Sequence, residues 1–139
     1  MAKFALVLFL LATVGAVAQH EPIPFSQLDV PPLFKGCVPE PPEAAIECTN
    51  KTLEAFVKGK FNTGLFKNLN LNEKRVRVYA QFTITTQGTI TDILVRTAHP
   101  QLKKETIRVL GLVPHFTPAR HNGKMERTKY VLPLVFTLG

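Results

Sequence analysis

The clearest pattern in the chain is an alternation of apolar and polar residues from about residue 75 to residue 85. A period of two residues is typical of a strand that buries one face. The apolar positions of this strand are Val76, Val78, Ala80, Phe82 and Ile84. A small sheet that helices cover on one face leaves the backbone groups of its edges open, and other chains bind at such edges. The open edges of the predicted sheet are therefore the candidate sites for a partner.

Two further segments have the pattern of strands. Residues 86–89 form a turn whose Gly88 tolerates a positive φ angle, and Ile90–Arg96 returns as the second strand of a hairpin. Apolar residues occur on both faces of this second strand, which leaves a bulge or two-sided packing open. The last strand is predicted over Thr128–Leu138. Pro133 cannot donate a hydrogen bond to a ladder, so this strand has an exposed side or a bulge.

Two segments have the period of amphipathic helices. The first runs from about Asn50 to Phe61, with Thr49 or Asn50 as its N-cap. The second begins at Pro100 and stops at Gly111, since proline suits a first turn and glycine a helix end. The order is therefore helix, strand, strand, helix, strand. This order predicts an α+β fold, a two-layer sandwich in which two helices cover one face of a three-stranded antiparallel sheet.

Residues 1–18 have the features of a secretory signal peptide. A single lysine precedes the apolar stretch Phe4–Ala18, which ends in an Ala-x-Ala cleavage motif. We expect cleavage between Ala18 and Gln19 and export to the periplasm. The stretch is shorter than the roughly 20 residues that span a bilayer comfortably, yet its retention as a short inner-membrane anchor stays open. Residues 19–49 are predicted to form a proline-containing arm with a disulfide loop, and residues 50–139 the folded domain.

Composition adds a covalent link and excludes several partners. Cys37 and Cys48, the two cysteines, predict a disulfide in an exported chain. The four histidines lack the spacing of metal ligands, so we expect no metal site. The formal charge of +7 comes from basic residues spread along the chain without runs or interleaved aromatic residues. Nucleic acid is therefore not an expected partner, and the charge suits a protein surface in an anionic cell envelope.

The sequence offers no machinery for catalysis or for holding a cofactor. Ser26 is the one serine and lies in the predicted arm, while both cysteines are assigned to the disulfide. A nucleophile needs an adjacent base, and neither such a pair nor a glycine-rich phosphate loop occurs in the sequence. We therefore expect no catalytic residues, no cofactor and no enzymatic activity.

A series of short stretches carries a family resemblance. They are Pro32–Cys37, Phe56–Asn62, Arg77–Ile84, Gly88–Asp92, Ala98–Leu102, Ile107–Val109, Asn122–Lys124 and Tyr130–Phe136. Taken in order, they resemble the C-terminal domain of TonB in the form found in energy transducers of Bacteroidetes-type bacteria. No single stretch is decisive, but together they cover nearly all of the chain after the leader.

The resemblance implies a periplasmic module that binds a plug or TonB-box segment of an outer-membrane receptor by strand addition, in TonB-dependent energy transduction and transmembrane transport. It indicates the final strand as the acceptor, with Tyr130, Val131, Leu132, Pro133, Leu134, Val135 and Phe136 as its residues. The side chains of Leu132, Leu134 and Phe136 are expected in the core, so that only their backbone meets a partner. If the leader is kept as an anchor, the resemblance adds a proton-driven motor complex of the inner membrane as a partner.

A second hypothesis is an exported structural or interaction domain that has this fold without receptor coupling. Binding of receptor peptides separates the two hypotheses. Open sheet edges also pair with copies of themselves, so a homodimer stays open as well.

Overall fold

The computed structural model describes residues 22–23, 25–69, 71 and 74–138 of the chain. The predicted leader, with its cleavage site between Ala18 and Gln19, lies outside the described residues. Within the described part, no helix combines the length and apolar character needed to cross a membrane.

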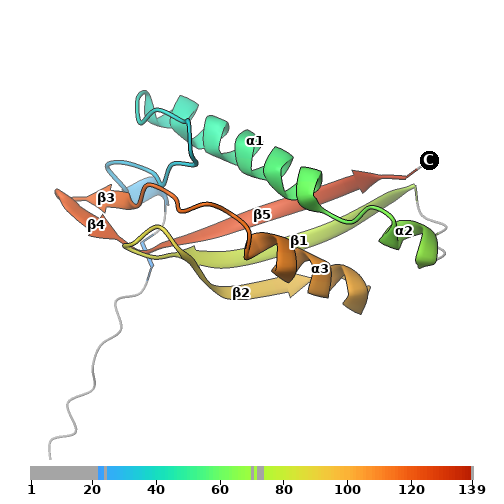
Figure 1. The fold of residues 1–139 in the computed structure, drawn as a ribbon. Coiled ribbons are helices and arrows are strands. Elements are labelled where there is room, and N and C mark those ends of the chain that lie inside the picture. The colour runs from blue at the N-terminus through green and yellow to red at the C-terminus, as the bar shows by residue number, and fades with distance from the viewer. Residues whose placement is uncertain (1–21, 24, 70, 72–73, 139) are drawn as a thin grey trace, which may run out of the picture.

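A three-stranded antiparallel sheet and two main helices make up the fold (Figure 1). The sheet has the order β2-β1-β5, so the first strand of the hairpin is central and the final strand is an edge. The main elements are α1 (Pro42–Lys60), β1 (Arg75–Ile84), β2 (Ile90–Arg96), α3 (Pro100–Leu110) and β5 (Thr128–Thr137). A 3-10 turn (Phe25–Gln27), a short helix α2 (Leu65–Asn68) and a hairpin of β3 (Ala119–His121) and β4 (Lys124–Glu126) complete the order. The α+β prediction and the order of its five elements are confirmed.

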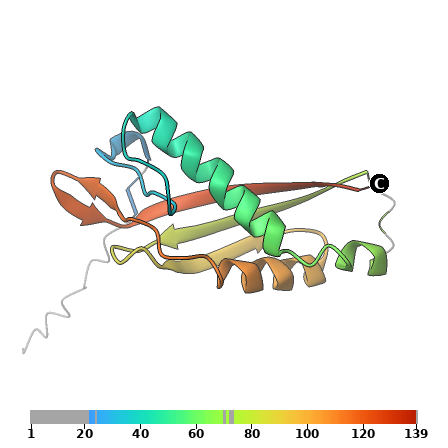
Figure 2. The same ribbon diagram turned by 45° about the horizontal axis from the view of Figure 1, so that its top comes forward.

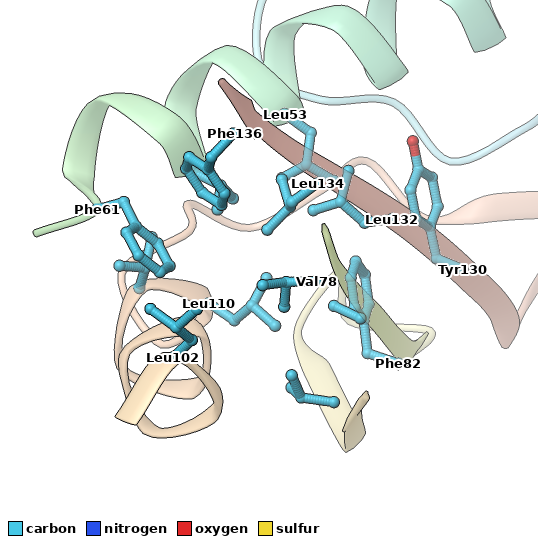
Figure 3. Packing of buried hydrophobic residues seen from close by; sticks show 14 of the residues in the cluster. Leu53, Phe61, Val78, Phe82, Leu102, Leu110, Tyr130, Leu132, Leu134 and Phe136 are labelled. Carbon is cyan, nitrogen blue, oxygen red and sulfur yellow. The ribbon is translucent and has the colours of Figure 1, made fainter. Parts of the chain in front are cut away.

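Both main helices lie on the same side of the sheet (Figure 2), where α1 contacts β5 and α3 contacts β1 and β2. The inward residues of the strands and the apolar stripes of the helices meet in one core (Figure 3). Val78, Leu53 and Leu102 are fully buried there. Two groups of aromatic rings extend the core toward the ends of β5. The opposite face of the sheet has no helix on it among the described residues.

The hairpin between β1 and β2 follows the sequence prediction closely. Gly88 has a φ angle of 81°, and a Cβ atom built there would lie 1.9 Å from the carbonyl oxygen of Phe116. The same Phe116 donates its amide to the Gly88 carbonyl at 2.8 Å, so the turn holds the loop that follows α3. The register between β1 and β2 shifts between Gln81 and Thr83, and Asp92 has a φ angle of 52°. Of the two alternatives for β2, the bulge is therefore the one observed.

Helix α1 begins much earlier than the predicted start near Asn50. It starts at Pro42 behind an extended Pro41, because proline is compatible with the first turn of a helix, where no backbone donor is required. The prediction of Thr49 or Asn50 as the N-cap is wrong. Instead the Thr49 hydroxyl accepts a hydrogen bond from the Phe34 amide at 3.1 Å. The cluster of prolines suggested an irregular loop where the chain in fact enters a helix.

The arm that precedes α1 lies against the domain. Val30 and Leu33 form isolated bridges with Arg120 and Thr117, beside the β3–β4 hairpin. The side chain of Phe34 enters the core and is 6% exposed. The predicted disulfide between Cys37 and Cys48 is present and joins the arm to α1. A loop of this size stabilises the fold by about 3 kcal/mol in the chain-entropy description.

Glu105 links α3 to the end of α1 through hydrogen bonds. It is buried on α3, 7% exposed, and its carboxylate accepts the Asn62 amide at 2.7 Å. Arg108 donates to the same carboxylate at 2.5 and 2.9 Å, and also donates to the Lys60 carbonyl at 3.1 Å. This hydrogen bonding to Arg108, followed by that from Asn62, holds the pKa of Glu105 below its ordinary value of 4.5 against the opposing effect of burial.

Replacing Glu105 by Gln should lower the free energy of unfolding at pH 7 by about 1–3 kcal/mol, because a buried charge-assisted contact is lost. Because the pKa of Glu105 is lowered in the folded state, the stabilisation by its carboxylate is complete above pH 4.5. It disappears as the pH falls below that value. Urea unfolding of both proteins across pH 3–7 measures this. Glu54→Gln, which removes an exposed pair with Lys58, is the control and should cost less than about 0.5 kcal/mol. The difference in unfolding free energy between wild type and Glu105→Gln should shrink at low pH. A difference that stays the same would contradict the assignment of this stabilisation to the charged carboxylate.

Candidate functional site

The fold leaves two sheet edges, and they differ in regularity. Strand β5 pairs with β1 without interruption from Thr128 to Thr137. Strand β2, the other edge, contains the bulge at Asp92, which distorts an edge and disfavours the addition of another strand. The free edge of β5 is therefore the better acceptor for a foreign strand.

The backbone groups of β5 alternate between the sheet and the outside. The Leu138 amide donates to the Lys74 carbonyl at 2.8 Å, which places residue 138 in a hydrogen-bonded pair that faces the neighbouring strand. In an antiparallel ladder the next residue points both its N–H and its C=O the other way. By this alternation, the residues of β5 whose backbone groups point outward include Val131, Pro133, Val135 and Thr137. The carbonyl of Arg127 accepts a hydrogen bond from the Ile23 amide at 3.1 Å. Arg127 therefore also points its backbone outward, as the alternation requires.

Side-chain burial follows the same alternation, since successive residues of a strand also change face. The sequence-predicted residues fall into two groups, which is a distinction the sequence reasoning did not draw. Those that bond to β1 with side chains in the core are Tyr130, Leu132, Leu134 and Phe136, and those that face outward with exposed side chains are Val131, Pro133 and Val135. The expected core positions of Leu132, Leu134 and Phe136 are confirmed. The expectation that their backbone meets a partner is wrong, because the backbone groups of these residues bond to β1.

Pro133 occupies an outward position, where its missing N–H removes no bond from the sheet. It pairs with Tyr79 of β1 within an uninterrupted register, so the predicted exposed side is the alternative that holds for β5, and no bulge occurs. An incoming strand therefore finds a carbonyl acceptor at Pro133 but no donor. The outward donors on either side of it are the amides of Val131 and Val135.

The start of β5 is partly covered by the chain's own arm. Ile23 forms a parallel bridge with Thr128, the first residue of the strand. Among the described residues, this is the one segment paired with the outer side of β5. The 3-10 turn at Phe25–Gln27 follows directly, so the arm leaves the edge after this bridge. From Val131 to Thr137, no described segment pairs with the outer side of the strand.

Contacts on the core side keep β5 in place. The Tyr130 hydroxyl donates to the Asn50 side chain of α1, and its ring stacks on Phe82 at a centroid distance of 5.3 Å. Burial raises the pKa of the Tyr130 phenol, so this group remains a neutral donor at any physiological pH. Near the other end of the strand, the ring of Phe136 packs against that of Phe61, with 4.7 Å between the ring centroids. The strand is therefore held at both ends by contacts on its core side. Beyond the Ile23 bridge, its outer side is unpaired among the described residues.

Sequence reasoning missed two residues of this edge. The backbone of Thr137 points outward like that of Val131 and Val135, and the predicted alternation was sufficient to find this residue. Ile23 limits the open edge through a backbone bond, and a backbone bond between distant segments leaves no mark in side-chain pattern. Within the described residues, no group of three or more His, Cys, Asp or Glu side chains is placed to hold a metal ion.

Comparison with known proteins agrees with this architecture. Residues 70–138 match the model of the family described as Gram-negative bacterial TonB protein C-terminal. The match covers the three strands of the sheet and α3, while α1 and the disulfide precede it. No curated protein matches the chain.

The alternation of β5 predicts an alternation in amide hydrogen exchange. Amides that bond to β1 (Tyr130, Leu132, Leu134 and Phe136) should exchange slowly. The outward amides of Val131, Val135 and Thr137 should exchange about 100-fold faster or more, because they have no hydrogen-bond partner among the described residues. Exchange followed by NMR at single-residue resolution measures this. Uniform protection along the strand would show that the edge is already covered and would rule out the site.

Proposed function

We propose that the outer edge of β5 binds an extended segment of a TonB-dependent outer-membrane receptor by strand addition, because residues 70–138 match the TonB C-terminal family. The family is a non-catalytic one that acts in TonB-dependent energy transduction. The observation that carries the proposal is the open row of backbone groups from Val131 to Thr137. The acceptor residues are those of the predicted set, with Val131, Pro133 and Val135 in direct backbone contact and Tyr130, Leu132, Leu134 and Phe136 holding the strand to β1.

Strand addition suits the transmission of force. Main-chain hydrogen bonds bind a segment without requiring particular side chains, which allows one edge to accept receptors of different sequence. When a strand is pulled along its length, the bonds of the ladder are loaded together rather than one at a time. Strand β5 passes such a load to the core, because its inward residues are buried and its register with β1 is continuous.

The arm restricts where the receptor segment lies. Ile23 occupies the edge beside Thr128, so the added strand pairs with the stretch from Val131 onward. Pro133 lies within this stretch and withholds one donor. A receptor segment whose carbonyl faces Pro133 leaves that carbonyl without a partner, and this mismatch disfavours such a register by about 1 kcal/mol or more.

The location and wider role of the protein follow from the fate of the leader. We place the domain in the periplasm. Cleavage between Ala18 and Gln19 would make it a free strand-binding partner, whereas a retained leader would anchor it in the inner membrane within reach of a proton-driven motor complex. Sequencing the N-terminus of the protein from the envelope fraction distinguishes these forms, since a start at Gln19 eliminates the anchored one.

Substitutions that change only the outward donors test the proposal. Val131→Pro removes an outward N–H and should weaken binding of receptor N-terminal peptides about tenfold, while Val131→Ala retains the N–H and should bind nearly as wild type. Pro133→Ala adds a donor and should strengthen binding by about two- to tenfold. Isotope-labelled protein titrated with the peptides and followed by NMR gives the dissociation constants.

The control for folding is the thermal unfolding of each variant, which should change little because the altered amides face away from β1. Two results would overturn the proposal: no binding of any receptor peptide at millimolar concentration, or equal binding by Val131→Pro and Val131→Ala. The first would favour the second hypothesis, an exported interaction domain without receptor coupling.

A further inference from the structure

The sheet face opposite the helices is a second surface, distinct from the β5 edge. It is formed by the outward side chains of all three strands, and we call it the open face. Pairing places its residues in rows: Leu94, Gln81 and Val131 form one, Arg96, Tyr79 and Pro133 the next, Arg77 and Val135 a third, and Arg75 and Thr137 a fourth, with Lys129 beside Thr83 at the other end.

The open face carries charge of one sign. Arg75, Arg77, Arg96 and Lys129 are all exposed on it. The three strands contain a single acidic residue, Asp92, which lies in the bulge of β2 and already pairs with Arg127 at 3.3 Å. The basic groups of the open face therefore lack a carboxylate partner among the described strands.

Apolar side chains occupy the middle of the open face. Tyr79, Leu94, Val131 and Val135 are between 38% and 57% exposed, which is unusual for neighbouring large side chains on one surface. Tyr79, Leu94, Arg96 and Val131 line a shallow hollow of about 350 Å³. An apolar centre with a charged rim is the composition of a protein-binding surface.

We propose that the open face binds an amphipathic helix of a partner protein that carries acidic residues beside its apolar stripe. A segment lying across a sheet face cannot pair its backbone with the strands, so it must satisfy its own hydrogen bonds, which a helix does. Such a helix completes a third layer over a sheet that α1 and α3 cover on one side only. Carboxylates on the helix supply the ion-pair partners that Arg77, Arg96 and Lys129 lack within the described part of the chain.

The two other possible occupants fit less well. A second copy of the chain would present the same basic residues, and like charges brought face to face repel. An anionic bilayer would attract the arginines, but insertion requires apolar side chains that project from the surface, and here Tyr79, Leu94 and Val131 line a hollow beside Arg96. A single apolar side chain of a helix fits such a hollow.

The length of the face sets the length of the helix. From Lys129 to Thr137 the strand advances roughly 26 Å at 3.3 Å per residue. A helix of about 17 residues spans that distance at 1.5 Å per residue. The binding does not use the outward backbone groups of β5, so the inference is independent of strand addition.

A designed peptide is the probe for this surface. It is a synthetic helix of about 17 residues with a leucine stripe flanked by glutamates, compared with a counterpart in which lysines replace the glutamates. Titrated into the labelled full chain, the glutamate peptide should shift the NMR signals of Tyr79, Leu94 and Val131, and the lysine peptide should not. The double variant Arg77→Glu/Arg96→Glu should weaken binding at least tenfold. The matched control, Lys103→Glu/Lys104→Glu on the exposed side of α3, should change it less than twofold.

Four results would overturn the proposal: shifts confined to α1 or α3, equal binding of both peptides, full binding by the Arg77/Arg96 double variant, or co-sedimentation with phosphatidylglycerol vesicles in the absence of peptide binding. If the charge reversal unfolds the protein, Arg77→Gln/Arg96→Gln replaces it, with a weaker but still measurable loss expected. Receptor peptides titrated into the same double variant should bind as they bind wild type, so failure of this surface and failure of strand addition are told apart.

Discussion

The alternation of β5 is the constraint on which the rest of the structure depends. In an antiparallel strand the residues that turn their side chains to one face are also the residues that turn their backbone to one side. In β5 the residues packed in the core are therefore those bonded to β1, and the exposed ones turn their carbonyls and, except at Pro133, their amides away from β1. Core packing alone thus fixes which backbone groups a partner meets.

The elements around the sheet hold this arrangement without covering it. Tyr130 bonds to Asn50 of α1, Glu105 fastens α3 to the end of α1, and the disulfide joins the arm to α1. All of these contacts lie on the helix side or at the ends of the strands. An edge that is already ordered loses less conformational entropy when a partner adds to it, which favours binding through backbone bonds alone.

The sequence predicted those parts of the fold in which the alternation of apolar and polar side chains follows burial. Period-two alternation placed β1 and β5 to within one residue, and Pro100 with Gly111 bounded α3. The same reasoning failed at Pro42, because a proline that begins a helix looks the same in sequence as one in a loop. It also missed the contact between Ile23 and β5, which is made by backbone atoms that every residue has. The sequence predicted β5 as a strand, whereas the division of its residues into inward and outward groups required the pairing with β1.

The edge and the open face meet at Val131 and Val135. Each of these residues offers its backbone to an added strand and its side chain to the open face. An added strand would extend the sheet beyond β5 and place its own alternate side chains on the same face, so that a helix bound there would touch both chains. Each ligand would then contribute contacts to the other, and the resulting coupling free energy is reciprocal by linkage. With a strand bound at the β5 edge, the open face would therefore bind a helix with a different affinity than it does without that strand.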